Sequence, residues 1–409
     1  MSWQRSAASV VHRHIWQRLP HGLRRQALLH ASSRLAPRPD PHARPVQPVF
    51  VAGYFRTASG LGESARLCAE ACHPLGYDTR TVDISAEHMQ PTDLPHDAVA
   101  DARSHLGPGT VILHVNAPLV PLALLQLGRS FVRSKHIIGT WAWELERVPP
   151  DWRRGLPFVH QAWAPSRFTA EAVRRKAPAP PIRVVPHPLA VRARPGATGS
   201  RDRFRVLMIF NAASSFARKN PCAGIAAFRR AFGADANAEL IVKSSNLDVY
   251  PGARAALKTA IGGPSNIRHI DHVLPPHEIE ALYESADAVL SLHRSEGFGL
   301  VPAEAMLRGL PVMATNWSGN EDFLDADNGC PVRYGLVPAR DPQGVYDFPD
   351  LRWAEPDIDH AAENLRRLSS DPDWRTRIGR RAAEDAARIF SLEAYGAVMN
   401  ELVGRPSSH

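Results

Sequence analysis

Short apolar runs alternate with longer amphipathic segments along most of the chain. Runs of four to six mainly apolar residues, bounded by turn residues, are typical of strands buried on both faces, whereas the segments between them space their apolar residues as helices do. We expect strands in the first half at residues 49–54, 79–84, 110–115, 136–141, 161–164 and 182–185. This alternation predicts a parallel sheet with helices on both faces.

The same rhythm restarts after residues 186–203, which are dense in proline, glycine and arginine. Second-half strands are expected at residues 205–210, 239–242, 267–270, 288–292 and 311–314. We therefore predict an α/β fold of two Rossmann-like, doubly wound domains that face each other across a cleft. The predicted boundaries are a basic N-terminal arm at 1–48, a first domain at 49–190, a linker at 191–203, a second domain at 204–388, and a C-terminal helix at 389–409 that crosses back to the first domain.

Length and composition agree with this division. A chain of 409 residues exceeds what one core usually organises, and 44% apolar with 22% charged residues is ordinary for a globular protein. No stretch approaches the roughly 18 to 20 apolar residues that span a bilayer. The four cysteines form no disulfide or metal framework, so we expect a reducing compartment, the cytoplasm.

The net charge of +8 is concentrated at the N-terminus. Residues 1–48 hold eight arginines against one acid, Asp40, and the rest of the chain is nearly neutral, which argues against a nucleic-acid partner. Apolar residues between those arginines suit a helix on an anionic membrane surface, which would make the protein peripheral on the inner face of the membrane. Docking of this arm on the first domain is an equal alternative, and a transit peptide is a third.

Residues 295–307, with the sequence SEGFGLVPAEAML, contain the strongest chemical signal. Glu296 and Glu304 stand eight residues apart around a glycine turn that links an expected strand to an expected helix. The backbone N–H groups of such a turn, here Gly297, Phe298, Gly299 and Leu300, bind phosphate. Carboxylates beside a phosphate make sense if they bind hydroxyls that accompany it, and a nucleotide-sugar contains both kinds of group. The alternative is that Glu296 caps the helix and Glu304 is solvated.

Two further segments are candidates for holding the same anion. Gly60 and Gly62 follow the first expected strand and allow close approach of the backbone, although a tight structural turn is the competing interpretation. A dinucleotide fingerprint is disfavoured because Ala65 stands where its third glycine would be. Arg218 and Lys219 follow the first strand of the second half, where two cations could offset charge on a departing diphosphate. An exposed basic turn is the alternative there.

Residues that could bind a second substrate, a sugar acceptor, are less clearly marked in the sequence. Residues 139–146 end a strand with Trp141, Trp143 and Glu144, which could stack on a sugar and bind its hydroxyls, or could form a buried aromatic cluster. His114 and Asn116 end another strand and are reserve candidates. Two Asp-x-Asp sequences, at residues 325–327 and 357–359, follow no convincing strand, and we expect no metal and no cofactor.

The segment at 295–307, with Gly309-Leu310-Pro311-Val312 and Gly319-Asn320-Glu321, resembles the Glu-x7-Glu signature of retaining glycosyltransferases of family 4. The resemblance implies a GT-B fold and retaining, metal-independent transfer. It assigns Glu296 to the hydroxyls of the transferred sugar, Glu304 to the ribose, Lys219 to the diphosphate, and the loop of Gly60 and Gly62 to the donor phosphates and the acceptor. The family's arginine before Lys219 is missing, and Arg218 is its candidate substitute. The family's active-site histidine is also missing, and Trp141 stands near its place.

Three segments, GYFR, GLGE and WAWEL, are similar to bacterial mannosyl or hexosyl transferases of surface polysaccharide pathways. We therefore expect GDP-mannose as the first candidate donor and a UDP-hexose as the second. The expected acceptor is a glycan or a lipid-linked glycan. Two other functions stay open. One is a GT-B epimerase acting on the nucleotide-sugar alone, and the other is an inactive scaffold of a polysaccharide assembly complex.

Overall fold

The computed structural model describes residues 21–95, 102–175, 179–190, 203–263 and 266–404. The first twenty residues of the basic arm, and all but the last residue of the expected linker, lie outside these ranges. Within them, no helix is both long and apolar enough to cross a membrane.

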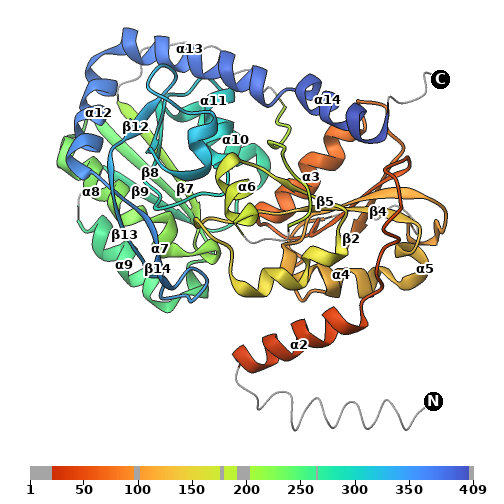
Figure 1. Cartoon of the computed structure of the whole chain (residues 1–409). Helices are drawn as coiled ribbons and strands as arrows, with labels where there is room; N and C mark the ends of the chain where they lie inside the picture. The colour runs from red at the N-terminus through yellow and green to blue at the C-terminus, as the bar shows by residue number, and fades with distance from the viewer. Residues whose placement is uncertain (1–20, 96–101, 176–178, 191–202, 264–265, 405–409) are drawn as a thin grey trace.

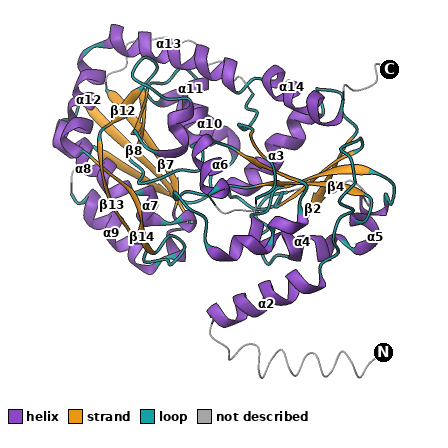
Figure 2. Ribbon diagram, in the orientation of Figure 1, coloured by secondary structure: helices purple, strands orange, loops and turns teal. Residues whose placement is uncertain are grey.

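The first half of the chain is built on a parallel sheet of six strands in the order β2-β1-β3-β4-β5-β6 (Figures 1 and 2). Its strands are β1 (Val49–Gly53), β2 (Thr79–Asp83), β3 (Gly109–Leu113), β4 (Lys135–Thr140), β5 (Gln161–Ala164) and β6 (Ile182–Val184). Its helices are α2 (His21–Leu35), α3 (Gly60–Cys72), α4 (Val120–Leu127), α5 (Arg129–Val132) and α6 (Arg167–Arg174). Strands β1, β3 and β4 are buried at every position, as expected for strands covered on both faces.

The second half repeats this plan with the strand order β12-β11-β10-β7-β8-β9. Its parallel strands are β7 (Phe204–Asn211), β8 (Ala238–Ser245), β9 (Ile267–Asp271), β10 (Ala288–Ser291), β11 (Val312–Thr315) and β12 (Cys330–Val332). Its helices are α7 (Phe216–Lys219), α8 (Pro221–Phe232), α9 (Pro251–Ile261), α10 (Pro276–Ser285), α11 (Leu300–Leu307), α12 (Ile358–Ser370) and α13 (Pro372–Ile389). The expected fold class, two doubly wound parallel sheets, is confirmed.

Strand order determines where a ligand can bind. In the first sheet the order reverses between β1 and β3, and in the second it reverses between β7 and β10. Loops that leave the carboxyl ends of two such strands diverge to opposite faces of the sheet and leave a crevice between them. The segments that follow β7 and β10 hold Arg218, Lys219 and Glu296, so both of the second half's main candidate motifs border this crevice.

A hairpin that the sequence did not predict joins the two halves. Strands β13 (Tyr334–Ala339) and β14 (Phe348–Pro356) pair antiparallel outside both main sheets. Although the hairpin follows the second sheet in sequence, it contributes four residues to the hydrophobic core of the first half: Ala339, Tyr346, Leu351 and Trp353. Its tip region also donates a hydrogen bond from the hydroxyl of Tyr346 to Glu144 Oε2, at 2.7 Å.

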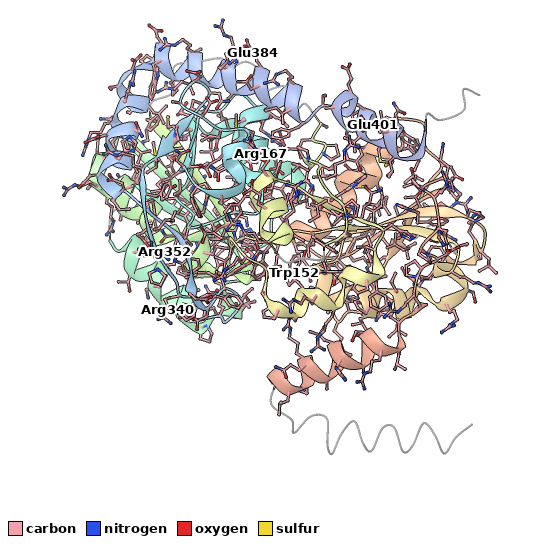
Figure 3. The ribbon with its side chains drawn as sticks, viewed as in Figure 1. Trp152, Arg167, Arg340, Arg352, Glu384 and Glu401 are labelled. Carbon is pink, nitrogen blue, oxygen red and sulfur yellow. The ribbon has the colours of Figure 1, made fainter. Side chains whose placement is uncertain are left out.

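The last described helix, α14 (Leu392–Val403), lies on the first half, beyond the end of α13 (Figure 1). Tyr395 and Met399 of this helix share a hydrophobic core with α3 and β1. The hydroxyl of Tyr77 donates to Asn400 Oδ1 at 2.6 Å. At the opposite side of this half, α2 packs against α4. A second polar contact between the halves joins the guanidinium of Arg167, at the start of α6, to Asp322 Oδ1 at 2.8 Å (Figure 3).

Candidate active site

A cavity of about 730 Å³ lies between the two halves. Both halves line it. The first half contributes residues that follow β1, β3 and β4, including Tyr54, Gly60, Asn116, Trp143 and Glu144. The second half contributes Asn211, Arg218, Lys219, Lys243 and the turn from Glu296 to Pro302. A cleft of this size between two domains is a usual place for a small-molecule site.

The glycine turn after β10 is held by a second loop that packs directly beneath it. The backbone N–H of Glu296 donates to Ser318 Oγ at 2.8 Å, and the N–H of Gly319 donates to the carbonyl oxygen of Glu296 at 2.9 Å. Gly299 has φ of 103°, a conformation that favours glycine. A Cβ at Gly319 would lie 2.5 Å from the carbonyl carbon of Gly297 and 2.7 Å from the nitrogen of Phe298. Position 319 therefore admits only glycine while the turn keeps its place.

Substitution of Gly319 by alanine is expected to destabilise the protein by about 1–3 kcal/mol, because the added Cβ must push the backbone of the acidic turn. Chemical denaturation of the two proteins measures the change in the free energy of unfolding. Gly335→Ala is the matched control, since a Cβ at Gly335 meets no atom within 4 Å. Equal stability of both variants would show that the turn is not packed as described.

The carboxylate of Glu296 is held between two cations. Lys219 Nζ lies 2.5 Å from Oε1 and Arg218 Nη1 lies 3.0 Å from Oε2. The side chain of Arg218 is only 2% exposed, that of Glu296 10% and that of Lys219 21%. Two cations against one carboxylate leave this wall of the cavity with a net positive charge. The structure thus brings together the three residues that the sequence analysis assigned to catalysis.

Local backbone geometry places these cations. Helix α7 is a single turn whose N-cap, Ser215, has φ of 76° and accepts the N–H of Arg218 at 3.1 Å. The turn ends at Asn220 in the left-handed conformation. The Arg218 guanidinium also donates to the carbonyl oxygens of Ser295, at 2.7 Å, and Ser214, at 2.9 Å. Arg218 therefore ties the segment after β7 to the acidic turn after β10.

The charges of the three groups oppose the cost of burying them. Burial raises the pKa of Glu296, but the neighbouring charges of Lys219 and Arg218 outweigh it and hold the pKa of that carboxyl well below its usual range. Burial likewise opposes the charge on Arg218, yet the carboxylate of Glu296 raises the pKa of Arg218 above its ordinary value. For Lys219 burial dominates and the pKa is lowered, although Glu296 opposes that shift. The site is a buried ion cluster whose charges depend on one another.

The remaining predicted donor residues divide into two groups. Gly297, Phe298, Gly299 and Leu300 line the cavity at the start of α11, and so does Gly60. Gly62 lies within α3, where a Cβ would stand 2.6 Å from the carbonyl oxygen of Tyr54, so close backbone packing requires this glycine. Glu304 is not among the described residues that line the cavity, and its Oε2 accepts a hydrogen bond from Tyr283 at 3.0 Å. Its assignment to the ribose stays a prediction.

The expected acceptor residues lie in two different environments. Trp143, Glu144 and Asn116 line the cavity, whereas Trp141 and His114 do not. The ring of Trp141 folds back over Gly139, where a Cβ would lie 2.5 Å from the indole Nε1, and the residue is 1% exposed. His114 is 2% exposed, and its Nδ1 lies 2.8 Å from Ser64 Oγ. Both side chains are buried in the protein interior. For Trp141 this agrees with the alternative interpretation of a buried aromatic cluster.

The cavity residues missed by the sequence analysis include Tyr346, Lys243 and His187. Tyr346 comes from the unpredicted hairpin, and its ring centre lies 5.3 Å from the Arg218 guanidinium. Lys243, at the end of β8, is 4% exposed, and burial lowers its pKa. His187 stands between two prolines, within the proline-rich residues 186–203 that separate the two predicted sets of strands. A lysine directly after the predicted strand at residues 239–242 was the one signal in the sequence that could have marked Lys243.

The acidic pairs considered as metal ligands have structural roles. Asp357 caps α12, its Oδ1 accepting the N–H of His360 at 2.9 Å. Asp325 Oδ1 accepts the N–H of Asp327 at 2.8 Å within its own turn. Across the described ranges, no group of three or more His, Cys, Asp or Glu side chains is arranged to hold a metal ion.

Comparison with known proteins points to one family. Residues 166–377, about half of the chain, match the family model described as "Family 4 Glycosyltransferase in conflict systems". A D-inositol 3-phosphate glycosyltransferase of Corynebacterium urealyticum is 33% identical over 129 residues, which are 31% of this chain and 25% of that protein. Its counterpart in Frankia alni is 32% identical over 138 residues, or 33% of this chain and 29% of that protein. The matched region thus spans about a quarter to a third of the length of these relatives.

Solved structures share the fold. Anabaena HepE in complex with UDP-glucose superposes with a TM-score of 0.61 at 14% identity, over 86% of this chain and 98% of that one. Sucrose-phosphate synthase from Thermosynechococcus elongatus superposes with a TM-score of 0.60 at 16% identity, over 87% of this chain and 98% of that one. A Staphylococcus aureus TarM mutant bound to UDP superposes with a TM-score of 0.55 at 12% identity, over 72% of this chain and 55% of that one. These neighbours are GT-B glycosyltransferases, and the expected GT-B fold is confirmed.

Proposed function

Because the chain belongs to family 4 of the glycosyltransferases, in the group found in conflict systems, we propose that it is a retaining hexosyltransferase that uses a nucleotide-diphosphate sugar. The observation that supports this most strongly is the buried cluster of Glu296, Lys219 and Arg218 at the edge of the interdomain cavity. Its net positive charge, beside the N-terminus of α11, suits a diphosphate, and its carboxylate suits sugar hydroxyls.

The proposed reaction breaks the bond between the anomeric carbon and the diphosphate. Positive character develops on the sugar and negative charge on the leaving group. Lys219, Arg218 and the amides of Gly297 to Leu300 would stabilise the departing diphosphate, because fixed donors at a buried site need no reorganisation. Glu296 would bind the sugar hydroxyls. The acceptor's hydroxyl oxygen would bond to the anomeric carbon on the same face that the diphosphate leaves, and its proton would pass to the leaving phosphate. Attack on this face preserves the anomeric configuration, and the step as proposed uses no metal.

Trp143, Glu144 and Asn116 line the opposite wall and would bind the acceptor, a glycan or lipid-linked glycan. Glu144 accepts a hydrogen bond from Tyr346, which fixes the direction of its carboxylate. TarM has been solved in complex with UDP together with glycan-like molecules, and HepE with UDP-glucose, which supports a donor and an acceptor sharing one cleft here.

Addition of the correct nucleoside diphosphate is expected to raise the melting temperature. A ligand that binds only the folded state, present at a hundred times its Kd, stabilises that state by about 2.7 kcal/mol. UDP, GDP and ADP are to be compared in thermal unfolding, with the matching monophosphates as controls that lack the second phosphate. A shift with GDP favours GDP-mannose as the donor, and a shift with UDP favours a UDP-hexose. No shift with any diphosphate would contradict the proposed site.

Turnover separates the alternatives. Incubation of the purified protein with UDP-glucose or GDP-mannose, with and without a glycan acceptor, is expected to release nucleoside diphosphate. Conversion of the donor into its epimer without release would instead identify an epimerase. Absence of both reactions, with the nucleotide still bound, would identify an inactive scaffold.

A further inference from the structure

His187 occupies the segment that crosses from the first half to the second. The backbone N–H of Val185 donates to the carbonyl of Ala164 in β5, at 2.8 Å, and that of Leu189 donates to Phe390, at 3.0 Å. Val185 belongs to a core of the first half and Leu189 to a core of the second. Pro186 and Pro188 fix φ on either side of the histidine. The position of His187 is therefore set by both halves of the protein.

His187 is 9% exposed and lines the interdomain cavity. Its ring packs edge-on against Phe298, with 4.8 Å between ring centres, and Phe298 is two residues after Glu296. On its other side, Nδ1 lies 3.4 Å from Ser64 Oγ, at the first turns of α3. The other ring nitrogen, Nε2, has no hydrogen-bond partner among the described residues and is the polar atom left for a molecule in the cavity.

Ser64 links the side chain of His187 to that of His114. Its hydroxyl lies between Nδ1 of His187 and Nδ1 of His114, the latter at 2.8 Å. A hydroxyl has one hydrogen, so it donates to one imidazole and accepts from the other. Two neutral rings that share this hydroxyl carry opposite tautomers, and the contact with Ser64 orients the ring of His187. Burial, with the neighbouring His114, lowers the pKa of His187 to about 3, so the ring is neutral at physiological pH.

A neutral ring nitrogen suits a hydroxyl better than a phosphate. The positively charged wall lies on the second half, at Arg218 and Lys219, and a diphosphate is drawn to it. A sugar hydroxyl can both donate and accept, so it pairs with Nε2 in either tautomer. Contact with Phe298 places His187 beside the acidic turn, on the side from which Glu296 would hold the sugar.

We propose that His187 binds a hydroxyl of the transferred sugar, and that Ser64 is a positioning residue that orients it. This inference rests on the proposed transferase function and adds to it a sugar-binding residue contributed by the crossover segment.

Binding measurements on the full chain test this proposal. UDP and UDP-glucose, and separately GDP and GDP-mannose, are titrated into wild type, His187→Leu, His187→Gln and Ser64→Ala. For the nucleotide that wild type binds, His187→Leu should weaken the nucleotide-sugar about tenfold, the loss of one hydrogen bond, and leave the nucleoside diphosphate within twofold. His187→Gln, which keeps a polar group at this place, should recover part of the loss, and Ser64→Ala should show a smaller loss of the same selectivity.

Other outcomes overturn the proposal. If His187→Leu weakened the binding of the nucleoside diphosphate and of the nucleotide-sugar equally, His187 would contact the phosphates and not the sugar. If His187→Leu bound the donor as wild type does but had a raised KM for the acceptor, His187 would contact the acceptor and not the transferred sugar. Failure of His187→Gln to recover any affinity, in a variant that unfolds at the wild-type temperature, would show that the histidine only fills space. If wild type itself binds none of the four nucleotides, the proposed function fails first, and this failure is distinct from the others.

Discussion

Replacement of Glu296 by alanine is expected to reduce sugar transfer at least a hundredfold, the scale associated with losing one preorganised polar contact in a transition state. Glu296 is the carboxylate through which both Lys219 and Arg218 are held at the cavity edge, at 2.5 and 3.0 Å. Its loss would remove the proposed partner of the sugar hydroxyls and would release Lys219. Release of nucleoside diphosphate under saturating donor measures the effect.

The fold should survive this change. Arg218, the most buried cation of the cluster, keeps hydrogen bonds to the carbonyl oxygens of Ser295 and Ser214 after Glu296 is truncated. Near-ultraviolet circular dichroism should be unchanged. Glu384→Ala is the matched control, because that glutamate lies on the outer side of α13 and is 56% exposed (Figure 3). Turnover of Glu296→Ala equal to that of the control would remove Glu296 from the catalytic assignment.

Lys219→Ala is expected to cause a loss of turnover of similar size, together with weaker binding of the nucleoside diphosphate. The ammonium group would bind the leaving diphosphate, and a neutral side chain cannot oppose the charge that develops there. Stability should change little, since burial already disfavours this charge and lowers the pKa of Lys219. Lys258→Ala, at an exposed lysine of α9, controls for loss of one positive charge in the same half. Normal turnover with normal nucleotide affinity would contradict the assignment.

Arginine should not replace Lys219 fully. Its planar guanidinium is longer and directs its donors in a fixed fork, whereas Lys219 Nζ makes a single short contact with Glu296 Oε1. Lys219→Arg therefore tests whether charge alone suffices. A variant that keeps diphosphate affinity but loses turnover would show that the position of the charge matters as well as its presence.

The second-half site was predictable because its geometry follows from local rules. Buried parallel strands show as continuous apolar runs, and a glycine turn at the end of such a run can be placed without knowing the rest of the fold. Strands β7 and β10 are neighbours at the reversal of strand order, which brings Lys219 and Glu296 together although they are 77 residues apart. Two motifs found separately in the sequence thus meet in space.

Other features depend on tertiary packing that no local pattern encodes. Trp141 and Trp143 are two residues apart, yet the first folds back onto Gly139 and the second lines the cavity. The hairpin of β13 and β14 was missed because much of it is exposed and its strands have no long apolar run. His187 was missed because its flanking prolines are typical of a linker, and only the contacts with Ser64 and Phe298 reveal its place.

The hairpin of β13 and β14 has a consequence for protein engineering. Tyr346 and Trp353 follow the second sheet in the chain but complete the hydrophobic core of the first half. A chimaera that exchanged everything after the crossover segment for the equivalent part of a relative would remove these side chains and leave the recipient's core unfilled. Grafting a new donor specificity onto this scaffold therefore calls for splice points that retain residues 334–356 with the amino-terminal portion.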